Sequence, residues 1–267
     1  MEPKLKRSYA LSVAVAVLMA VQAAVAILMP DLYRDEEWAL EAWRLNDIVT
    51  FVLAVPVLVG ALVLARRGSL RAVLVWFGVL QYALYNYAFY LFGAALNVFF
   101  LLYVVLFALS VLALILGFIG IDADRIRRSF GERTPARLVT GYLAFWAVAL
   151  GFAWIGQWLG FVVAGQVPAL GEEPFRLIAA LDLSLVVAPL LIASALLWRR
   201  RAWGLILAVV LLVKGVLYSL LLSAASLPLI DGEWGGDPLL PLWLVLAAGA
   251  IASLAALLVN LRARQGP

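Results

Sequence analysis

Eight apolar runs, each about as long as a transmembrane helix, constrain the fold of this chain more than any other feature. A helix needs about 20 predominantly apolar residues to cross the hydrocarbon core of a bilayer. Short segments rich in proline, glycine and charge separate the runs. The sequence therefore predicts an all-α polytopic membrane protein. The runs cover residues 9–29, 45–65, 72–92, 98–120, 138–163, 177–198, 204–226 and 239–261.

Composition supports this fold class and excludes several kinds of site. Of the 267 residues, 66% are hydrophobic and 13% are charged, whereas soluble domains are about 25% charged. The chain has no cysteine and no histidine. It therefore lacks the residues for a disulfide framework, a Ser-His-Asp triad or a His-ligated haem. We expect neither a cofactor nor a metal site.

The distribution of charge predicts how the chain is threaded. If the N-terminus is cytoplasmic, the inner segments hold 16 of the 20 lysines and arginines, and ten of the 16 acidic residues lie in the outer segments 31–41, 172–173 and 231–237. An excess of lysine and arginine marks cytoplasmic loops. We therefore predict an inner (plasma) membrane protein with both termini in the cytoplasm and with anionic lipid head groups at its inner arginine clusters. Topology explains the net charge of +4 without a nucleic-acid partner.

A shift of 133 residues aligns a sparse set of similar positions. Identity beyond them is thin, and Leu-rich helices also align by chance. A true duplication would divide the membrane domain into halves at residues 1–133 and 134–267, each with four helices. Because four is even, the halves would share one orientation, as in transporters with parallel repeats. The shift pairs Tyr9 with Tyr142, Pro56 with Pro189, Gln81 with Lys214 and Tyr85 with Tyr218.

Two ionisable residues lie well inside predicted helices, where such residues are costly and often functional. Asp182 falls in the outer third of the sixth run, and Lys214 lies near the middle of the seventh. A lysine side chain can extend several ångströms along its helix, so an Asp182–Lys214 pair is geometrically possible. The pair would be either a structural ion pair or a working site for an ion, a proton or a substrate.

Asp47 opens the second run and has two interpretations. Aspartate is a preferred N-cap, so Asp47 would cap this helix. Alternatively, it would join Asn46, Asn86 and Tyr85 in a polar cluster at the outer ends of the second and third helices.

Pro56 and Pro189 lie inside the second and sixth runs. Each proline removes an intrahelical hydrogen bond and tends to kink its helix. The carbonyl groups of Val52 and Leu185, four residues earlier, lose their donors and need other partners in lipid. We expect either kinks for packing or free oxygens that ligate a cation or water.

The third run carries polar residues on two overlapping faces. Gln81 and Tyr85 are spaced i, i+4, and Tyr82 and Asn86 share the neighbouring face. We expect these four to face inward, where they would line a ligand pocket or form interhelical hydrogen bonds.

Aromatic residues near the predicted outer interface have a simpler expectation. Tyr87 and Tyr90 would belong to an interfacial aromatic belt. Residues 30–44 would form a short interfacial helix with Trp43 on its apolar face, anchored at the surface or acting as a lid.

The sequence thus predicts an integral membrane protein with a polar pocket in its outer half that binds or transports a small solute or cation. The alternative is a membrane sensor, scaffold or partner subunit that transports nothing. A lesser alternative is an intramembrane enzyme, although no paired-acid motif on an inner loop supports one. The candidate ligand-binding residues are Asp47, Gln81, Tyr82, Tyr85, Asn86, Asp182, Lys214 and Tyr218.

Overall fold

The chain folds almost entirely into helices. The computed structural model describes residues 5–131, 134–227 and 239–261, and one isolated β-bridge in these ranges joins Phe130 to Leu261. The α-helices are α1 (Lys6–Leu28), α2 (Glu37–Val49), α3 (Val55–Arg66), α4 (Leu70–Gly93), α5 (Phe100–Gly120), α6 (Ala123–Ser129), α7 (Ala136–Ala164), α8 (Glu172–Asp182), α9 (Ala188–Trp198), α10 (Ala202–Ala225) and α12 (Leu240–Asn260). A 3-10 turn, η2 (Pro30–Leu32), and two π-helical segments, η3 (Thr50–Ala54) and η4 (Leu183–Val187), complete the order.

The prediction of eight membrane-spanning helices is confirmed. In the described part of the chain, eight helices are long and apolar enough to cross a bilayer. The protein is therefore an all-α, multi-pass membrane protein. The spanning segments are Lys6–Leu28, Ala39–Arg66, Leu70–Gly93, Phe100–Gly120, Ala136–Ala164, Glu172–Trp198, Ala202–Ala225 and Leu240–Asn260.

Local sequence signals set several helix ends. Ser69 accepts the backbone N–H of Ala72 at 3.2 Å at the start of α4, and Asp122 accepts that of Arg125 at 2.9 Å at the start of α6. Both are short polar side chains of the kind preferred at N-caps. Gly165 ends α7 with a φ of 64°, a left-handed conformation that glycine adopts without a steric penalty.

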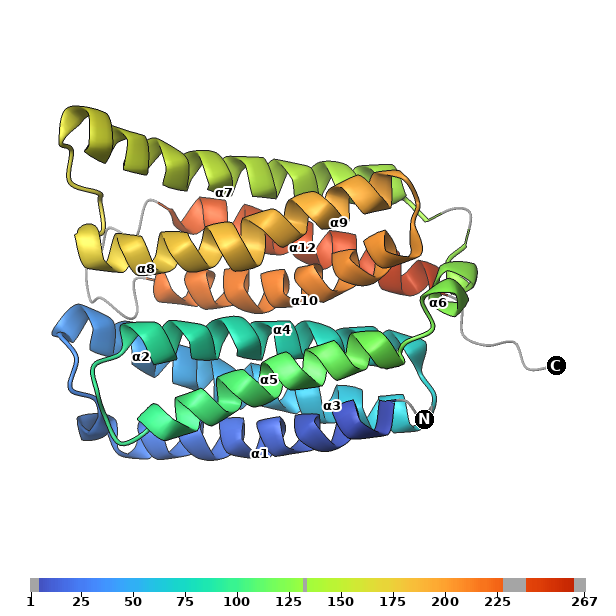
Figure 1. Ribbon diagram of the computed structural model, residues 1–267, viewed down its shortest axis with the longest axis horizontal. Coiled ribbons are helices and arrows are strands. Elements are labelled where there is room, and N and C mark those ends of the chain that lie inside the picture. Colours follow the sequence, from blue (N-terminus) through green and yellow to red (C-terminus); the bar gives the residue numbers. More distant parts are fainter. Residues whose placement is uncertain (1–4, 132–133, 228–238, 262–267) are drawn as a thin grey trace.

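The helices form two bundles that lie side by side (Figure 1). The N-terminal bundle comprises α1 to α5, and the C-terminal bundle comprises α7 to α12. In each bundle an interrupted spanning helix precedes a deeply buried one: α2–η3–α3 comes before α4, and α8–η4–α9 comes before α10. The segments η3 and η4 begin at Thr50 and Leu183, which are 133 residues apart, as are the prolines that follow them. The order of elements therefore recurs between the bundles.

The two bundles meet at an interface that we call the seam, where α4 contacts α10 and α8, and α10 contacts α2. Among the described spans, α4 and α10 are the most buried, at 78% and 72%, whereas the others reach 39% at most. The backbones of α4 and α10 come close at Gly78, where an added Cβ would collide with the side chain of Val213. Small residues permit such close approach between helices in lipid.

Charge separates the two ends of the molecule. The loops that join α3 to α4 and α9 to α10 lie at the same end as α6 (Figure 1). We call this the arginine-rich end, and its described basic residues are Lys6, Arg7, Arg66, Arg67, Arg71, Arg125, Arg127, Arg128, Arg137, Arg199, Arg200 and Arg201. The opposite end is the acidic end, with Asp31, Asp35, Glu36, Glu41, Glu172 and Glu173.

The prediction of a separate interfacial helix over residues 30–44 is wrong. Residues from Glu37 onward instead begin α2, which continues into the second spanning segment. Trp43 is 2% exposed, and its ring centroid lies 4.8 Å from those of Phe89 and Tyr90 on α4. Contact with α4 therefore holds this segment in the bundle instead of leaving it on the membrane surface.

Candidate functional site

Asp47 is the centre of a buried hydrogen-bond cluster in the N-terminal bundle. The residue lies inside α2 and is 1% exposed, so the N-cap interpretation is wrong. Its carboxylate accepts hydrogen bonds from Gln22 Nε2 at 3.0 Å, from the Tyr90 hydroxyl at 2.8 Å and from the Tyr33 hydroxyl. Three donors compensate for the removal of the carboxylate from water, as a buried acidic group requires.

Two neighbours of Asp47 depart from the expectation of an aromatic belt. Tyr87 and Tyr90 are 0% and 1% exposed, and Tyr87 donates to Gln22 Oε1 at 3.1 Å. Both tyrosines therefore belong to the interior and not to the membrane interface. Tyr33 lies outside the spanning segments, where burial, and then the nearby Asp47 carboxylate, raise the pKa of its hydroxyl above the ordinary value. The Tyr33 phenol thus stays protonated as a donor.

A second chain of polar groups joins α2, η3 and α4. Asn46 Nδ2 donates to Asn86 Oδ1 at 2.6 Å, and Asn86 Nδ2 donates to Thr50 Oγ1 at 3.4 Å. Thr50 Oγ1 lies 2.9 Å from the Tyr82 hydroxyl. Asn86 and Tyr82 are both fully buried, so they face inward as the spacing predicts. In the N-terminal bundle this polar face serves interhelical hydrogen bonding.

Asp182 is the centre of a different arrangement at the seam. Its carboxylate accepts the Tyr85 hydroxyl of α4 at 2.6 Å and the Trp154 indole N–H of α7 at 2.9 Å. Tyr85 therefore bonds across the seam to Asp182 and does not join Asp47, as one interpretation had placed it. Unlike Asp47, Asp182 is partly exposed and has two donors.

Lys214 lies beside Tyr85 and Tyr218 without a direct ion pair to Asp182 among the described residues. Its ammonium Nζ is 3.9 Å from the ring centroid of Tyr85 and 4.2 Å from that of Tyr218. Such positions over ring faces are attractive cation–π contacts. Asp182 interacts electrostatically with Lys214. The predicted pair is thus mediated by Tyr85, whose hydroxyl bonds Asp182 and whose ring faces Lys214.

Gln81 completes the seam site next to the proline of the C-terminal bundle. A continuous α-helix would pair the carbonyl oxygen of Leu185 with the N–H that Pro189 lacks. The helix adopts the π-helical segment η4 before Pro189, and Gln81 Nε2 donates to the Leu185 oxygen at 3.4 Å. The oxygen that the sequence indicated as lacking its usual donor therefore receives a donor from across the seam.

The eight candidate residues form one polar belt along α4. The rings of Tyr82 and Tyr218, 5.9 Å apart, connect the Asp47 cluster to the seam site. Within the described residues, no group of three or more acidic side chains could hold a metal ion. The belt can hold a carboxylate next to an ammonium group, and such an arrangement can bind a small cation or a solute that carries an amine.

Sequence reasoning missed four polar residues of the belt. They lie on helices remote in sequence, so only Gln22 carried a clear signal, as the amide of an otherwise apolar helix. The other three look ordinary in their local segments. The missed residues are Gln22, Tyr33, Thr50 and Trp154.

A cavity of about 710 Å³ opens at the acidic end of the seam. We call it the vestibule; the start of α2, the end of α4 and the start of α8 line it. At its base Gly93 of α4 packs against Leu177 of α8 so closely that an added Cβ would collide. Tyr85 lies eight residues further along α4 than Gly93, about 12 Å at the helical rise of 1.5 Å per residue. The Gly93–Leu177 contact therefore separates the vestibule from the seam site.

Comparison with known proteins gives one match, and it covers the C-terminal bundle. Residues 139–265 match a protein family described as a domain of unknown function (DUF8058). No curated protein and no solved structure matches the chain. The matched segment contains Asp182, Lys214 and Tyr218, whereas Gln81 and Tyr85 lie outside it.

Proposed function

We propose that the protein binds a small solute or cation at the seam and carries it across the membrane. The observation that supports this most is the position of Asp182, which directly precedes η4 and bonds to the opposite bundle through Tyr85. Transporters built from repeats bind solutes between their halves, where interrupted helices supply polar groups. Single π-helical turns are also frequent at functional sites.

The carrier would consist of two halves, residues 1–133 and 134–267, related by a duplication. The recurrence of η3 and η4 at the same 133-residue offset supports this division. The arginine-rich end would face the cytoplasm of a cell with an inner (plasma) membrane, and its arginines would contact anionic lipid head groups. The vestibule would then face outward.

Asp182 is a better ligand-binding group than Asp47. Asp47 is 1% exposed and accepts three hydrogen bonds, so its oxygens are committed to the fold. Asp182 is partly exposed and accepts two. We therefore assign binding to Asp182, and the fixing of α1, α2 and α4 relative to one another to Asp47.

Lys214 would act as an internal competitor for the solute. Its ammonium group is held by two ring faces and interacts with Asp182 through space. A cation or amine that entered from the vestibule would approach Asp182 against repulsion from Lys214. Release of the solute would follow as the ammonium group regained the field of the carboxylate.

Thermal unfolding tests the binding step. The purified protein would be heated in a panel of alkali cations, alkaline-earth cations, small amines and amino acids at constant ionic strength, with tryptophan fluorescence as the signal. A ligand that binds the folded state stabilises it by about 2.7 kcal/mol at 100 times its Kd. We expect a stabilising solute for wild type and for the exposed control Asp124→Asn, but not for Asp182→Asn. Lys214→Gln should bind a cationic solute more tightly because it removes the competing charge.

Two results would contradict the proposal. A solute that stabilises Asp182→Asn as much as wild type would bind somewhere other than the seam. If no solute of the panel stabilises wild type, and reconstituted vesicles show no flux of these solutes, the protein would not be a carrier of this class. The saturated hydrogen bonds of the belt would then favour the alternative of a sensor, scaffold or partner subunit.

A further inference from the structure

The C-terminal bundle has a second cavity that the seam site does not use. It is a groove of about 620 Å³ between α7 and α8. Figure 1 shows that α7 diverges from α8 toward the acidic end, whereas it stays close to η4 and α9. The volume lies within the range of roughly 300–1,000 Å³ that is usual for small-molecule sites.

The groove is apolar and opens toward the membrane. Trp154, Trp158, Phe161 and Phe175 contribute its aromatic lining. Trp158 is 52% exposed and Phe161 is 39% exposed, so this side of the groove would face hydrocarbon and not water. Tryptophan is enriched at the membrane interface, the depth expected of residues next to the acidic end. A hydrocarbon chain can enter such a groove sideways from the bilayer.

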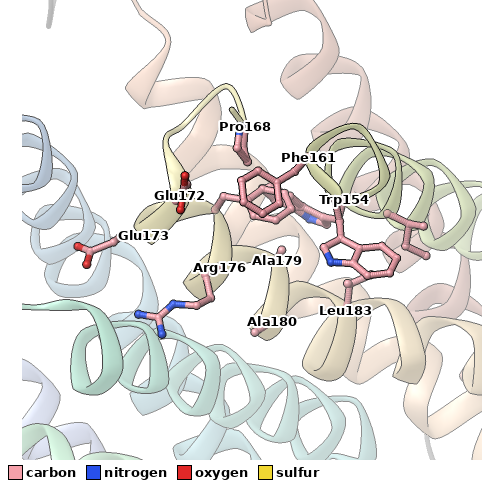
Figure 2. Close-up of a pocket in the computed structure, with 12 residues that line it drawn as sticks. Trp154, Phe161, Pro168, Glu172, Glu173, Arg176, Ala179, Ala180 and Leu183 are labelled. Carbon is pink, nitrogen blue, oxygen red and sulfur yellow. The ribbon is translucent and has the colours of Figure 1, made fainter. Parts of the chain in front are cut away.

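The upper part of the groove is charged. Glu172, Glu173 and Arg176 line both the groove and the vestibule, so α8 is a wall between the two cavities. Figure 2 shows Trp154 and Phe161 on one side of this wall, with Glu173 and Arg176 pointing away from them. In the described part of the chain, these three charged side chains form no ion pair or hydrogen bond with one another or with a neighbour. Two negative groups and one positive group are therefore available at the junction of an apolar groove and a polar cavity.

The N-terminal bundle closes the equivalent space. There α1 contacts α2 directly, and Gln22 and Tyr33 donate to Asp47 between them. In the C-terminal bundle, Trp154 alone donates from α7 to Asp182, and the groove lies beyond it. An open space on one side of an otherwise recurring arrangement indicates a ligand.

We propose that the groove binds one phospholipid of the surrounding bilayer with an amine-bearing, zwitterionic head group. The ammonium group would contact Glu172 and Glu173, the phosphate would contact Arg176, and an acyl chain would lie along the aromatic lining. Charge complementarity selects this class, because an anionic lipid without an amine would place its head group against two carboxylates. The lipid would also touch the seam site through Trp154, which lines the groove and bonds Asp182.

Native mass spectrometry of protein from nanodiscs tests the lipid site. The nanodiscs would contain equal amounts of phosphatidylethanolamine and phosphatidylglycerol, and lipids retained after partial delipidation would be identified. Wild type should retain one phosphatidylethanolamine in clear excess over phosphatidylglycerol. Ala180→Trp fills the groove and should lose this retention. Ala153→Trp is the matched control, since this exposed residue of α7 does not line the groove, and it should behave as wild type.

A charge variant keeps the test decisive if Ala180→Trp does not fold. The double variant Glu172→Gln, Glu173→Gln changes two exposed side chains, and retention should shift toward phosphatidylglycerol because Arg176 remains. Retention of both lipids in the nanodisc proportion by wild type, or undiminished retention by Ala180→Trp, would overturn the proposal. Solute-dependent stabilisation of Ala180→Trp equal to that of wild type would leave the seam function in place, so the two proposals fail separately.

Discussion

At the scale of single residues, the number of hydrogen-bond donors distinguishes the two membrane-embedded carboxylates. Asp47 has three donors and is buried, whereas Asp182 has two donors and is partly exposed. A buried acidic group that loses a donor bears the full cost of its desolvation. The two aspartates should therefore respond differently to loss of a neighbouring hydroxyl group.

Tyr90→Phe should destabilise the protein. The substitution removes the 2.8 Å hydrogen bond to Asp47 and leaves a buried carboxylate with two donors, at a cost of about 1–3 kcal/mol. A lower midpoint of thermal unfolding is the measurement. The control is Tyr9→Phe, because the partly buried Tyr9 contacts Trp76 through its ring, which phenylalanine preserves. Equal midpoints for the two variants would argue against a structural role for the Asp47 cluster.

At the scale of elements, the interrupted helices connect backbone chemistry to the seam. Pro189 lacks the N–H that a continuous α-helix would use, and η4 with Gln81 accommodates that loss. The first interrupted helix has the same order of π-helical segment and proline, with η3 before Pro56. Only in the second interrupted helix does a carboxylate directly precede the π-helical segment and reach across the seam.

Pro189→Ala should make the η4 region more regular. The added N–H can form a backbone hydrogen bond worth roughly 1 kcal/mol, which corresponds to about fivefold slower amide hydrogen exchange over residues 183–190. Hydrogen exchange with mass spectrometry is the measurement, and Pro56→Ala is the matched variant, which should slow exchange over residues 50–57 instead. Unchanged exchange in both variants would mean that the prolines do not cause the π-helical segments.

The contact between α4 and α10 leads to a packing prediction. At Gly78 an added Cβ would meet the Val213 side chain, whereas at Gly60 nothing lies within 4 Å. Gly78→Ala should therefore destabilise the protein by about 1–3 kcal/mol through overpacking. Gly60→Ala should be neutral or stabilise the protein by up to about 1 kcal/mol through helix propensity. Thermal unfolding of the two variants in parallel checks both directions, and a tolerated Gly78→Ala would show that the two central helices are not tightly packed.

At the scale of the whole molecule, the separation of charge defines two chemically different ends. The described basic residues cluster at the loops around α6, and the acids cluster at the opposite loops. Lysine and arginine near the ends of spanning segments oppose translocation, so this asymmetry determines orientation during insertion. The vestibule and the lipid groove both open at the acidic end, so orientation also determines the side from which ligands arrive.

Cysteine labelling should show the acidic end outside the cell. The chain has no cysteine of its own, so single substitutions at exposed positions report accessibility without background. A membrane-impermeant maleimide should label Gln166→Cys in intact cells, and Arg128→Cys only after the membrane is permeabilised. The reverse pattern would show that the molecule is inserted the other way around.

Much of the polar belt could be anticipated from helical spacing. The i, i+4 pairs of α4 indicate inward-facing Gln81, Tyr82, Tyr85 and Asn86, and each makes an interhelical polar contact. The partners could not be anticipated in this way. Spacing gives the face of one helix but not the identity of the helix packed against it.

The sequence by itself determined the number of spans, their ends to within a few residues, and the segregation of charge. These features are local, because a segment in lipid must satisfy its backbone internally and be apolar over a fixed length. Tertiary structure decided that Tyr87 and Tyr90 are buried, that Asp47 lies inside a helix, and that Tyr85 joins Asp182 to Lys214. Each of these depends on how α1, α2, α8 and α10 pack around α4, and packing between helices in lipid rests on shape and hydrogen bonds that no single segment specifies.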